Sequence, residues 1–250
     1  MKNKKVLLRL FIILTILLLG FIIYKLVILN KYKSEYISID VNKIFNETFN
    51  VLDTIEVDKN EILKFEDLCI RNYFVGYKEV ENNSQIKAKY DKYGEVESFY
   101  IISSSKQYTR ILNFDSFKLY SDDMNDNYNI STDKQTELYL KANKIANDID
   151  YLKYIKDNYY IKNSIFTPTR TIKNNFLTNT FVQVVLPEFE NITLINGRIN
   201  GYIISLKNSN AKEIHILNND IQYIITLSGE EIINNEFILE LLKTININCS

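Results

Sequence analysis

The sequence predicts an α+β fold: an N-terminal transmembrane helix, then antiparallel β-meanders with packed helices, including a C-terminal helix. Three observations predict it. A long apolar run opens the chain, short alternating segments separated by turn residues follow, and two stretches near residues 132–158 and 228–245 have the apolar period of a helix. This order implies helices packed on one face of antiparallel sheet.

The opening run has the length of a membrane span. Residues 10–24 are uncharged, and residues 6–29 contain only Arg9 and Lys25 as charges, near the ends. As a helix, residues 6–29 extend about 36 Å, against about 30 Å of hydrocarbon in a bilayer. Both basic side chains can extend to opposite interfaces along their apolar stems, and Tyr24 is an aromatic residue of the kind found there.

The run does not resemble a cleaved signal peptide. Cleavage needs small residues after a short apolar segment, but no alanine precedes Ala88 and only Ser34 is small between residues 25 and 37. No cysteine lies near the run, so the sequence does not indicate a lipid anchor. Residues 1–33 are therefore predicted to be an uncleaved signal anchor, and residues 34–250 a separate α+β domain.

Charge is distributed unevenly between these two parts. Residues 1–33 contain seven basic residues and no acidic one, whereas residues 34–250 contain the other 23 basic residues and all 31 acidic residues, a net charge of −8. An acidic domain is unsuited to nucleic acid, whose phosphates require a basic surface. Basic residues before the span slightly outnumber those after it, which favours a cytoplasmic N-terminus and an extracytoplasmic domain at the cell membrane.

The two cysteines, Cys69 and Cys249, leave two interpretations open. They could form one disulfide in an oxidising compartment. They could equally be separate side chains, with Cys69 packed beside its apolar neighbours. We favour the second, because there are only two cysteines and neither has a metal-type partner nearby.

The first half of the domain is predicted to contain one helix and several strands. An apolar period indicates an amphipathic helix over residues 41–57. Alternation then predicts strands in the segments 72–80, 85–103 (with a turn at 91–94), 108–114 and 117–121. Residues 122–132 are polar and predict a loop.

A long helix is predicted over residues 132–158. Thr132 can cap it, with Gln135 completing a capping box. Its apolar positions recur every three or four residues: Leu138, Ala142, Ile145, Ile149, Leu152 and Ile155. The opposite, solvated face would carry Lys141, Lys144, Asp148 and Lys153. This helix could separate two subdomains.

The last third predicts a meander and a closing helix. Strands are expected at 180–186, which ends at Pro187, and at 191–195, 199–207, 211–217 and 220–227, with a turn at 218–220. A second capping box at 228–231 begins the final helix. That helix should bury Ile232, Phe237, Ile238, Leu241, Leu242 and Ile245.

No stretch of the sequence indicates catalysis or a bound cofactor. His215 is the only histidine, and its strand position suggests a solvated side chain. One histidine and two distant cysteines do not make a zinc site. In the polar loop, Asp123, Asn125, Asn127 and Asn129 have the spacing of a calcium loop, but Tyr128 and Lys134 replace the glycine and glutamate it needs. No catalytic, cofactor-binding or metal-binding residue is predicted, and no enzyme is expected.

Residues 186–245 resemble a known domain type. They begin with Leu-Pro, contain a strand with "Gly-Tyr" and a hairpin with "Asn-Asp-x-x-Tyr", and close with a helix ending "Leu-Leu-Lys-Thr-Ile". This order is similar to the extracytoplasmic C-terminal domain of membrane-anchored anti-sigma-like proteins of Gram-positive bacteria. The resemblance covers about a quarter of the chain, transfers no functional residue, and does not imply sigma-factor binding.

Three functions are therefore considered. The first is a membrane-anchored extracytoplasmic module of the cell envelope that binds or senses, with membrane lipid around its N-terminal helix and an envelope protein as a possible partner. The second is a carrier of an apolar ligand or lipid, which would need an apolar cavity. The third is a wall-polymer hydrolase, which would need two carboxylates about 5–10 Å apart in a cleft.

Overall fold

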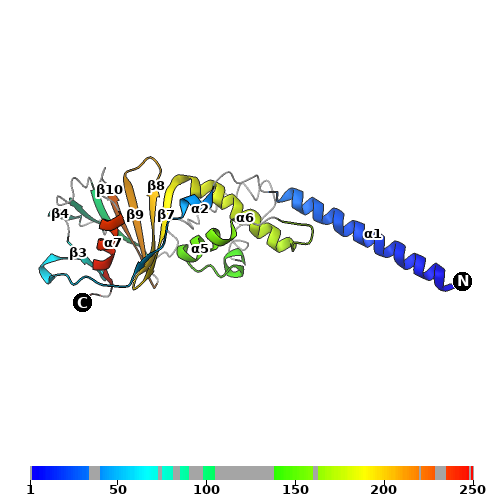
Figure 1. The fold of residues 1–250 in the computed structure, drawn as a ribbon, viewed down its shortest axis with the longest axis horizontal. Helices are drawn as coiled ribbons and strands as arrows, with labels where there is room; N and C mark the ends of the chain where they lie inside the picture. Colours follow the sequence, from blue (N-terminus) through cyan, green and yellow to red (C-terminus); the bar gives the residue numbers. More distant parts are fainter. Residues whose placement is uncertain are drawn as a thin grey trace.

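The computed structural model describes residues 2–33, 40–72, 75–80, 85–89, 98–104, 138–159, 163–219, 221–228, 235–247 and 249. This part of the chain is α+β, as predicted, with an apolar helix α1 (Lys2–Lys31) that projects from one end of the domain (Figure 1). The C-terminus lies at the opposite end (Figure 1). The predicted turn 91–94, the strands 108–114 and 117–121 and the loop 122–132 lie outside the described residues, as do the four calcium-loop positions.

A mixed sheet organises the domain. Within the described residues its strand order is β1-β7-β8-β9-β10-β6-β5-β4. The strands are β1 (Phe49–Val51), β4 (Val75–Val80), β5 (Gln85–Lys89), β6 (Ser98–Ser104), β7 (Phe189–Gly197), β8 (Asn200–Leu206), β9 (Ala211–Asn218) and β10 (Ile221–Ser228). The predicted meander is confirmed as β7 to β10, where each neighbouring pair is antiparallel. Only the β1–β7 pair is parallel among the described strand pairs.

One face of this sheet is covered by a small sheet and the last helix. The small sheet has the order β11-β3-β2, formed by β2 (Ile62–Phe65), β3 (Leu68–Arg71) and β11 (Asn246–Ile247), and α7 (Asn235–Thr244) packs beside it (Figure 1). The short helix η1 (Lys59–Glu61) leads into β2. Five residues predicted to be buried in the final helix are buried: Phe237, Ile238, Leu241, Leu242 and Ile245. Ile232 lies outside the described residues.

Helices cover the other face as well, so the expectation of helices on one face was wrong. These elements are α2 (Val41–Ile44), the helical turn 138–142, α5 (Asp148–Asn158), α6 (Thr169–Val185) and the short helix η2 (Leu186–Glu188). Their apolar side chains share a core with β7 and β8, in which Tyr151, Leu152, Ile192 and Ile204 have no exposed surface. In the described part of the chain, β7 and β8 therefore lie between two packed layers.

The predicted helix over residues 132–158 is interrupted. Residues 138–142 are helical, and Lys144 then adopts a positive φ of 57°. The amide of Ile145 closes the turn by donating to the carbonyl of Leu140 at 2.9 Å. A new helix, α5, begins at the cap Asn147, whose side chain accepts from the amide of Asp150 at 3.0 Å. The apolar period continues through this segment, but the helix ends at the positive φ of Lys144 and a new helix begins at the Asn147 cap.

The predicted amphipathic helix over residues 41–57 was wrong beyond its first turn. Only Val41–Ile44 is helical. Phe45 then forms a parallel bridge to Ile192, and β1 pairs in parallel with β7. Pairing with an existing strand satisfies the backbone as well as a helix does, and it buries Val51 completely.

The strand predicted at 180–186 was also wrong, because this segment ends α6. Its β-branched residues favour strands, but tertiary packing decides. Ile172, Phe176 and Val182 are buried along α6, and Leu186 is buried just beyond it, at spacings close to the helical period.

The cysteines form a disulfide, so the favoured interpretation of two separate side chains was wrong. Cys69 on β3 and Cys249 have Cα atoms 6.0 Å apart and are bonded through sulfur. β11 pairs with β3 immediately before Cys249, with Asn246 opposite Cys69. This pairing brings two cysteines that are 180 residues apart into bonding range.

Candidate functional site

The last two turns of α1 dock on α6. The contacting positions are Lys25, Ile28, Leu29 and Tyr32, which have the spacing of one helix face. Tyr32 is buried and meets the ring of Phe176 edge-on, with ring centroids 5.7 Å apart. The Nζ of Lys25, which is also buried, donates to the backbone carbonyl of Thr167. The helix is therefore fixed to the domain at one end.

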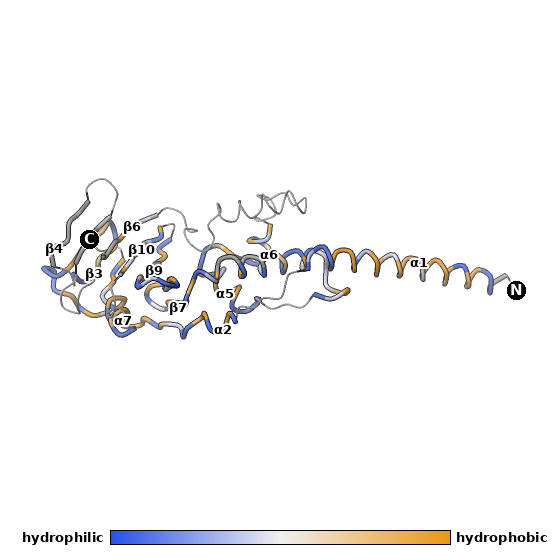
Figure 2. Tube along the Cα trace, turned by 90° about the horizontal axis from the view of Figure 1, so that it is seen from above, coloured by the Kyte–Doolittle hydropathy of each residue, from blue (hydrophilic) through white to orange (hydrophobic). Residues whose placement is uncertain are grey.

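The rest of α1 is apolar and uncovered. Between Val6 and Tyr24 its large apolar side chains, apart from the partly buried Ile22, are about half exposed or more, for example 72% for Leu7 and 66% for Leu17. Figure 2 shows hydrophobic residues along the whole middle of this helix. By length and composition, α1 could cross a membrane.

The turn that precedes α6 carries an exposed aromatic residue beside this junction. Ser164 and Thr167 close the turn, since the amide of Thr167 donates to the carbonyl of Ser164 at 3.0 Å and the amide of Ser164 donates to the hydroxyl of Thr167 at 2.9 Å. Phe166, between them, is 82% exposed. The same turn therefore accepts the buried Lys25 and presents a large apolar side chain to the surroundings.

A hollow of about 400 Å³ lies along α6 next to this turn. Arg170, Lys173, Asn174 and Leu177 line it from one face of α6, and Leu138 and Tyr139 line it from the neighbouring helical turn. Its walls combine two basic groups with apolar surface, so its charge suits an anionic group.

A chain of buried polar side chains lies under α5, on the opposite side of the sheet from α7. Its members come from α5 and three neighbouring strands: Asp148, Tyr202, Gln222, His215 and Glu213. Tyr202 and His215 are directly opposite each other on β8 and β9, and their rings stack with centroids 4.4 Å apart. Asp148, Tyr202, His215 and Gln222 have no exposed surface.

The arrangement of these five side chains fixes the direction of each hydrogen bond between them. The Tyr202 hydroxyl donates to Asp148 Oδ2 at 2.6 Å, so it must accept from the Gln222 amide nitrogen, 3.1 Å away. The other hydrogen of this amide faces His215 Nδ1 at 2.9 Å, which makes Nδ1 an acceptor. His215 then carries its proton on Nε2 and donates to Glu213 Oε2 at 3.2 Å. Both ring nitrogens of His215 are thus hydrogen-bonded, one to Gln222 and one to Glu213.

This enclosure also favours neutral phenol groups. Burial raises the pKa of Tyr202 well above its usual value, and the nearby Asp148 charge raises it further. Burial similarly raises the pKa of Tyr151 in the same core. These phenols serve as hydrogen-bond donors and packing groups rather than as acids near neutral pH.

The structure corrects two sequence predictions at this place. His215 was expected to be solvated, but both faces of the sheet are covered and its side chain is buried. Asp148 was assigned to a solvated helix face, but the break before α5 turns it inward to accept from Tyr202. Gly201 allows the close strand approach beside them, because a Cβ there would lie 2.0 Å from the carbonyl oxygen of His215. The sequence signal that was missed is the Asn147-Asp148 helix start.

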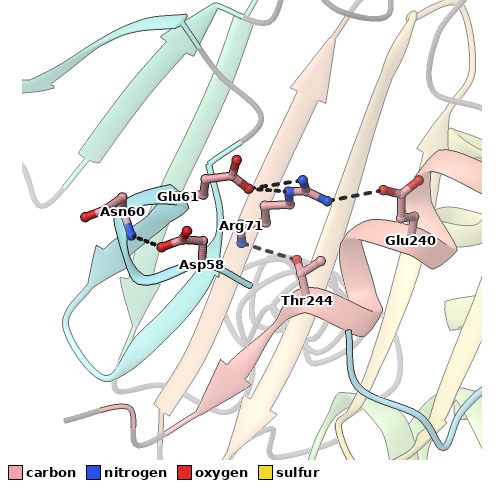
Figure 3. A network of polar contacts seen from close by, with 6 residues as sticks. All are labelled: Asp58, Asn60, Glu61, Arg71, Glu240 and Thr244. Carbon is pink, nitrogen blue, oxygen red and sulfur yellow. Dashed lines mark hydrogen bonds and ion pairs between the residues drawn. The ribbon is translucent and has the colours of Figure 1, made fainter. Parts of the chain in front are cut away.

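A third polar cluster joins the small sheet to α7 (Figure 3). The guanidinium of Arg71 contacts Glu61 at 3.0 Å and Glu240 at 4.0 Å, and its backbone amide donates to the Thr244 hydroxyl at 3.3 Å. These side chains are partly exposed, so the cluster links β3 to η1 and α7 without enclosing a site.

Within the described ranges, no three His, Cys, Asp or Glu side chains gather as they would around a metal ion. His215 has no surface that a substrate could reach. No family model, no curated protein and no solved structure matches this chain.

Proposed function

We propose that this protein is a membrane-anchored module whose α+β domain lies outside the cytoplasm and binds or senses a component of the cell envelope. One observation carries the proposal: α1 is docked to α6 by Lys25, Ile28, Leu29 and Tyr32, while its other apolar side chains are uncovered. In water, such a long uncovered apolar surface would be unstable or would aggregate. In a bilayer it is the expected surface of a transmembrane helix.

The disulfide supports an extracytoplasmic domain. Bonds of this kind persist in oxidising compartments and are rare in the cytosol. Because Cys69 and Cys249 are 180 residues apart, linking them restricts the unfolded chain strongly, by about 5 kcal/mol in the chain-entropy description. The excess of basic residues before the span agrees with this side of the membrane.

A binding or sensing role is preferred to the two other hypotheses. A lipid carrier would need an enclosed apolar cavity, whereas the hollow along α6 has Arg170 and Lys173 in its lining. A wall-polymer hydrolase would need two carboxylates in a cleft, whereas the lining of the hollow along α6 contains none. The resemblance of residues 186–245 to anti-sigma-like extracytoplasmic domains favours an envelope protein as the partner.

The location can be tested with the two cysteines. Cells producing the full-length protein are lysed in acid, and free thiols are labelled with a polymer-linked maleimide that adds visible mass. We expect no adduct without reductant and two adducts after reduction, while the Cys249→Ser variant takes one adduct without reductant. Two adducts on unreduced protein, or release of the protein from membranes by alkaline carbonate, would contradict the proposal.

The binding role can be tested by crosslinking in cells and by a turnover assay. We expect the full-length protein to crosslink reproducibly to the same envelope component, identified by mass spectrometry, and to release no soluble fragment from purified wall polymer. Steady release of such fragments would show an enzyme and would overturn the binding role without affecting the anchor.

A further inference from the structure

We propose that the turn 163–168 and the first turns of α6 form a second contact with the lipid surface, beside the one made by α1. Phe166 enters the boundary between headgroups and acyl chains, and Arg170 and Lys173 bind anionic headgroups. This inference rests on the proposed function, because it takes α1 as the membrane span.

The bond between Lys25 and Thr167 sets the depth of the turn. Residues 6–24 form the part of α1 before its docking face, and as a helix they extend about 28 Å, close to the roughly 30 Å of bilayer hydrocarbon. Lys25 therefore lies at the membrane interface. Thr167 accepts from its Nζ, so Phe166, the adjacent residue, lies at the same level. Figures 1 and 2 both show the start of α6 alongside the end of α1.

The side chains at this level suit an interface. Phe166 is 82% exposed on a turn closed by Ser164 and Thr167, so the fold holds the ring away from the core. Apolar and aromatic side chains that enter this boundary gain stability from the bilayer. Arg170 lies one helical turn beyond Phe166 and is exposed, and Lys173 follows on the same face of α6.

The charge of this segment differs from that of the rest of the domain. Residues 158–187 contain no aspartate or glutamate, although residues 34–250 together have a net charge of −8. Lys31 and Lys173 both lie within 6 Å of the Tyr32 ring centroid, at 5.8 Å and 5.5 Å, which adds positive charge at the junction. Basic groups without neighbouring acids attract anionic lipid headgroups.

Single tryptophans can locate the turn, because the chain contains none. Full-length Phe166→Trp is reconstituted in vesicles of phosphatidylcholine and phosphatidylglycerol, with or without lipid brominated near the headgroup end of its chains. Leu52→Trp is the matched control, since Leu52 is 76% exposed and directly follows β1, outside the proposed contact. Leu17→Trp reports on α1 itself, with lipid brominated near the chain ends.

The expected result separates the two contacts. Trp emission in F166W should shift to shorter wavelength and be quenched by the shallow brominated lipid, while L52W should be quenched by aqueous acrylamide only. If L17W is quenched by the deep lipid but F166W behaves like L52W, the second contact is wrong and the anchor stands. If L17W is not quenched, both proposals fail, and if L52W is quenched with F166W, the contact is not specific to the turn.

Charge variants test the headgroup contact. In the F166W background, Arg170→Gln with Lys173→Gln should reduce quenching in vesicles containing phosphatidylglycerol and leave it unchanged in pure phosphatidylcholine. Lys59→Gln with Lys64→Gln, two exposed lysines near the small sheet, should change neither. Equal quenching in all three proteins with phosphatidylglycerol would show that the basic residues do not bind headgroups and would overturn that part of the proposal.

Discussion

The central sheet contributes to a core cluster on each of its two faces, yet the two faces are built differently. The face under α7 and the small sheet is apolar, with Ile203, Ile214 and Ile225 from neighbouring strands packed on Leu241 and Leu242. The face under α5 and α6 adds the hydrogen-bonded chain from Asp148 to Glu213. The first face is stabilised by fit and apolar burial, and the second depends also on hydrogen bonds between its buried polar groups.

This difference shows how one strand can serve two environments. On β9, Ile214 and Ile216 enter the apolar face while His215 between them enters the polar chain. A polar residue at an alternating position is therefore compatible with burial when neighbouring strands supply donors and acceptors in register. The four predictions below test the comparison, from the largest expected effect to the smallest.

Leu241→Ala should reduce the free energy of unfolding most, because it opens a cavity in the apolar face. Leu241 has no exposed surface, and such truncations typically reduce the free energy of unfolding by about 3–5 kcal/mol. Leu52→Ala, at an exposed position, should change it by less than about 0.5 kcal/mol. Denaturant unfolding of the full-length protein in detergent, followed by near-ultraviolet circular dichroism, measures both. A loss below 1 kcal/mol for Leu241→Ala would mean that this face repacks.

Tyr202→Phe should reduce the free energy of unfolding by about 1–3 kcal/mol, because it removes the donor to Asp148 and the acceptor for Gln222. A double-mutant cycle with Asp148→Asn should give a coupling energy of about 0.5–3 kcal/mol. A cycle between Tyr202→Phe and Leu241→Ala, on opposite faces, should be additive within about 0.5 kcal/mol. Additivity in the first cycle would show that Tyr202 and Asp148 do not stabilise each other, and would contradict a cooperative row of polar side chains.

Alkaline pH should weaken the polar face, because it contains buried phenols. The pKa values of Tyr202 and Tyr151 are raised in the folded state, mainly by burial, so these phenols stay protonated above pH 10 while the unfolded chain loses its phenol protons. Their contribution is fully present below about pH 10 and is lost as the pH rises further. Each should lower the free energy of unfolding by about 1.4 kcal/mol per pH unit there. Unfolding curves at increasing pH measure this slope.

The matched variant is Tyr202→Phe, whose slope above pH 10 should be smaller than that of the natural protein by about 1.4 kcal/mol per pH unit. Equal slopes in the two proteins would show that Tyr202 ionises as easily in the fold as in the unfolded chain.

Glu240→Gln should have the smallest effect. Its carboxylate lies 4.0 Å from Arg71 at a partly exposed position, and such pairs contribute about 0–1 kcal/mol. The loss should shrink further at high salt. A loss above 2 kcal/mol in the same unfolding experiment would show that the cluster in Figure 3 is a buried ionic network instead.

The sequence predicted the elements whose stability is local or strictly periodic. The meander from β7 to β10 has alternating residues and short turns, and α7 has a clear apolar stripe, so both could be recognised. The segment 180–186 contains β-branched residues, and only its packing within α6 makes it helical. Residues 49–51 join the sheet because β7 is available to pair with them.

The polar chain could not be predicted for a related reason. Asp148 and His215 are 67 positions apart in sequence, and each alone resembles a surface residue. The register of β8, β9 and β10 and the break before α5 bring them into one chain. The disulfide likewise depends on β11 reaching β3, which the spacing of Cys69 and Cys249 does not encode.

The docking of α1 on α6 fixes the orientation of the domain relative to α1. A protein tethered by a loose linker can tumble above the bilayer, but a helix held by Lys25 and Tyr32 transmits its tilt to everything attached to it. In the proposed arrangement, with α1 upright in lipid, the small sheet and the disulfide-linked C-terminal end lie farthest from the bilayer (Figure 1). In the proposed membrane arrangement, the contact between α1 and α6 thus sets the orientation of the domain and its reach from the bilayer.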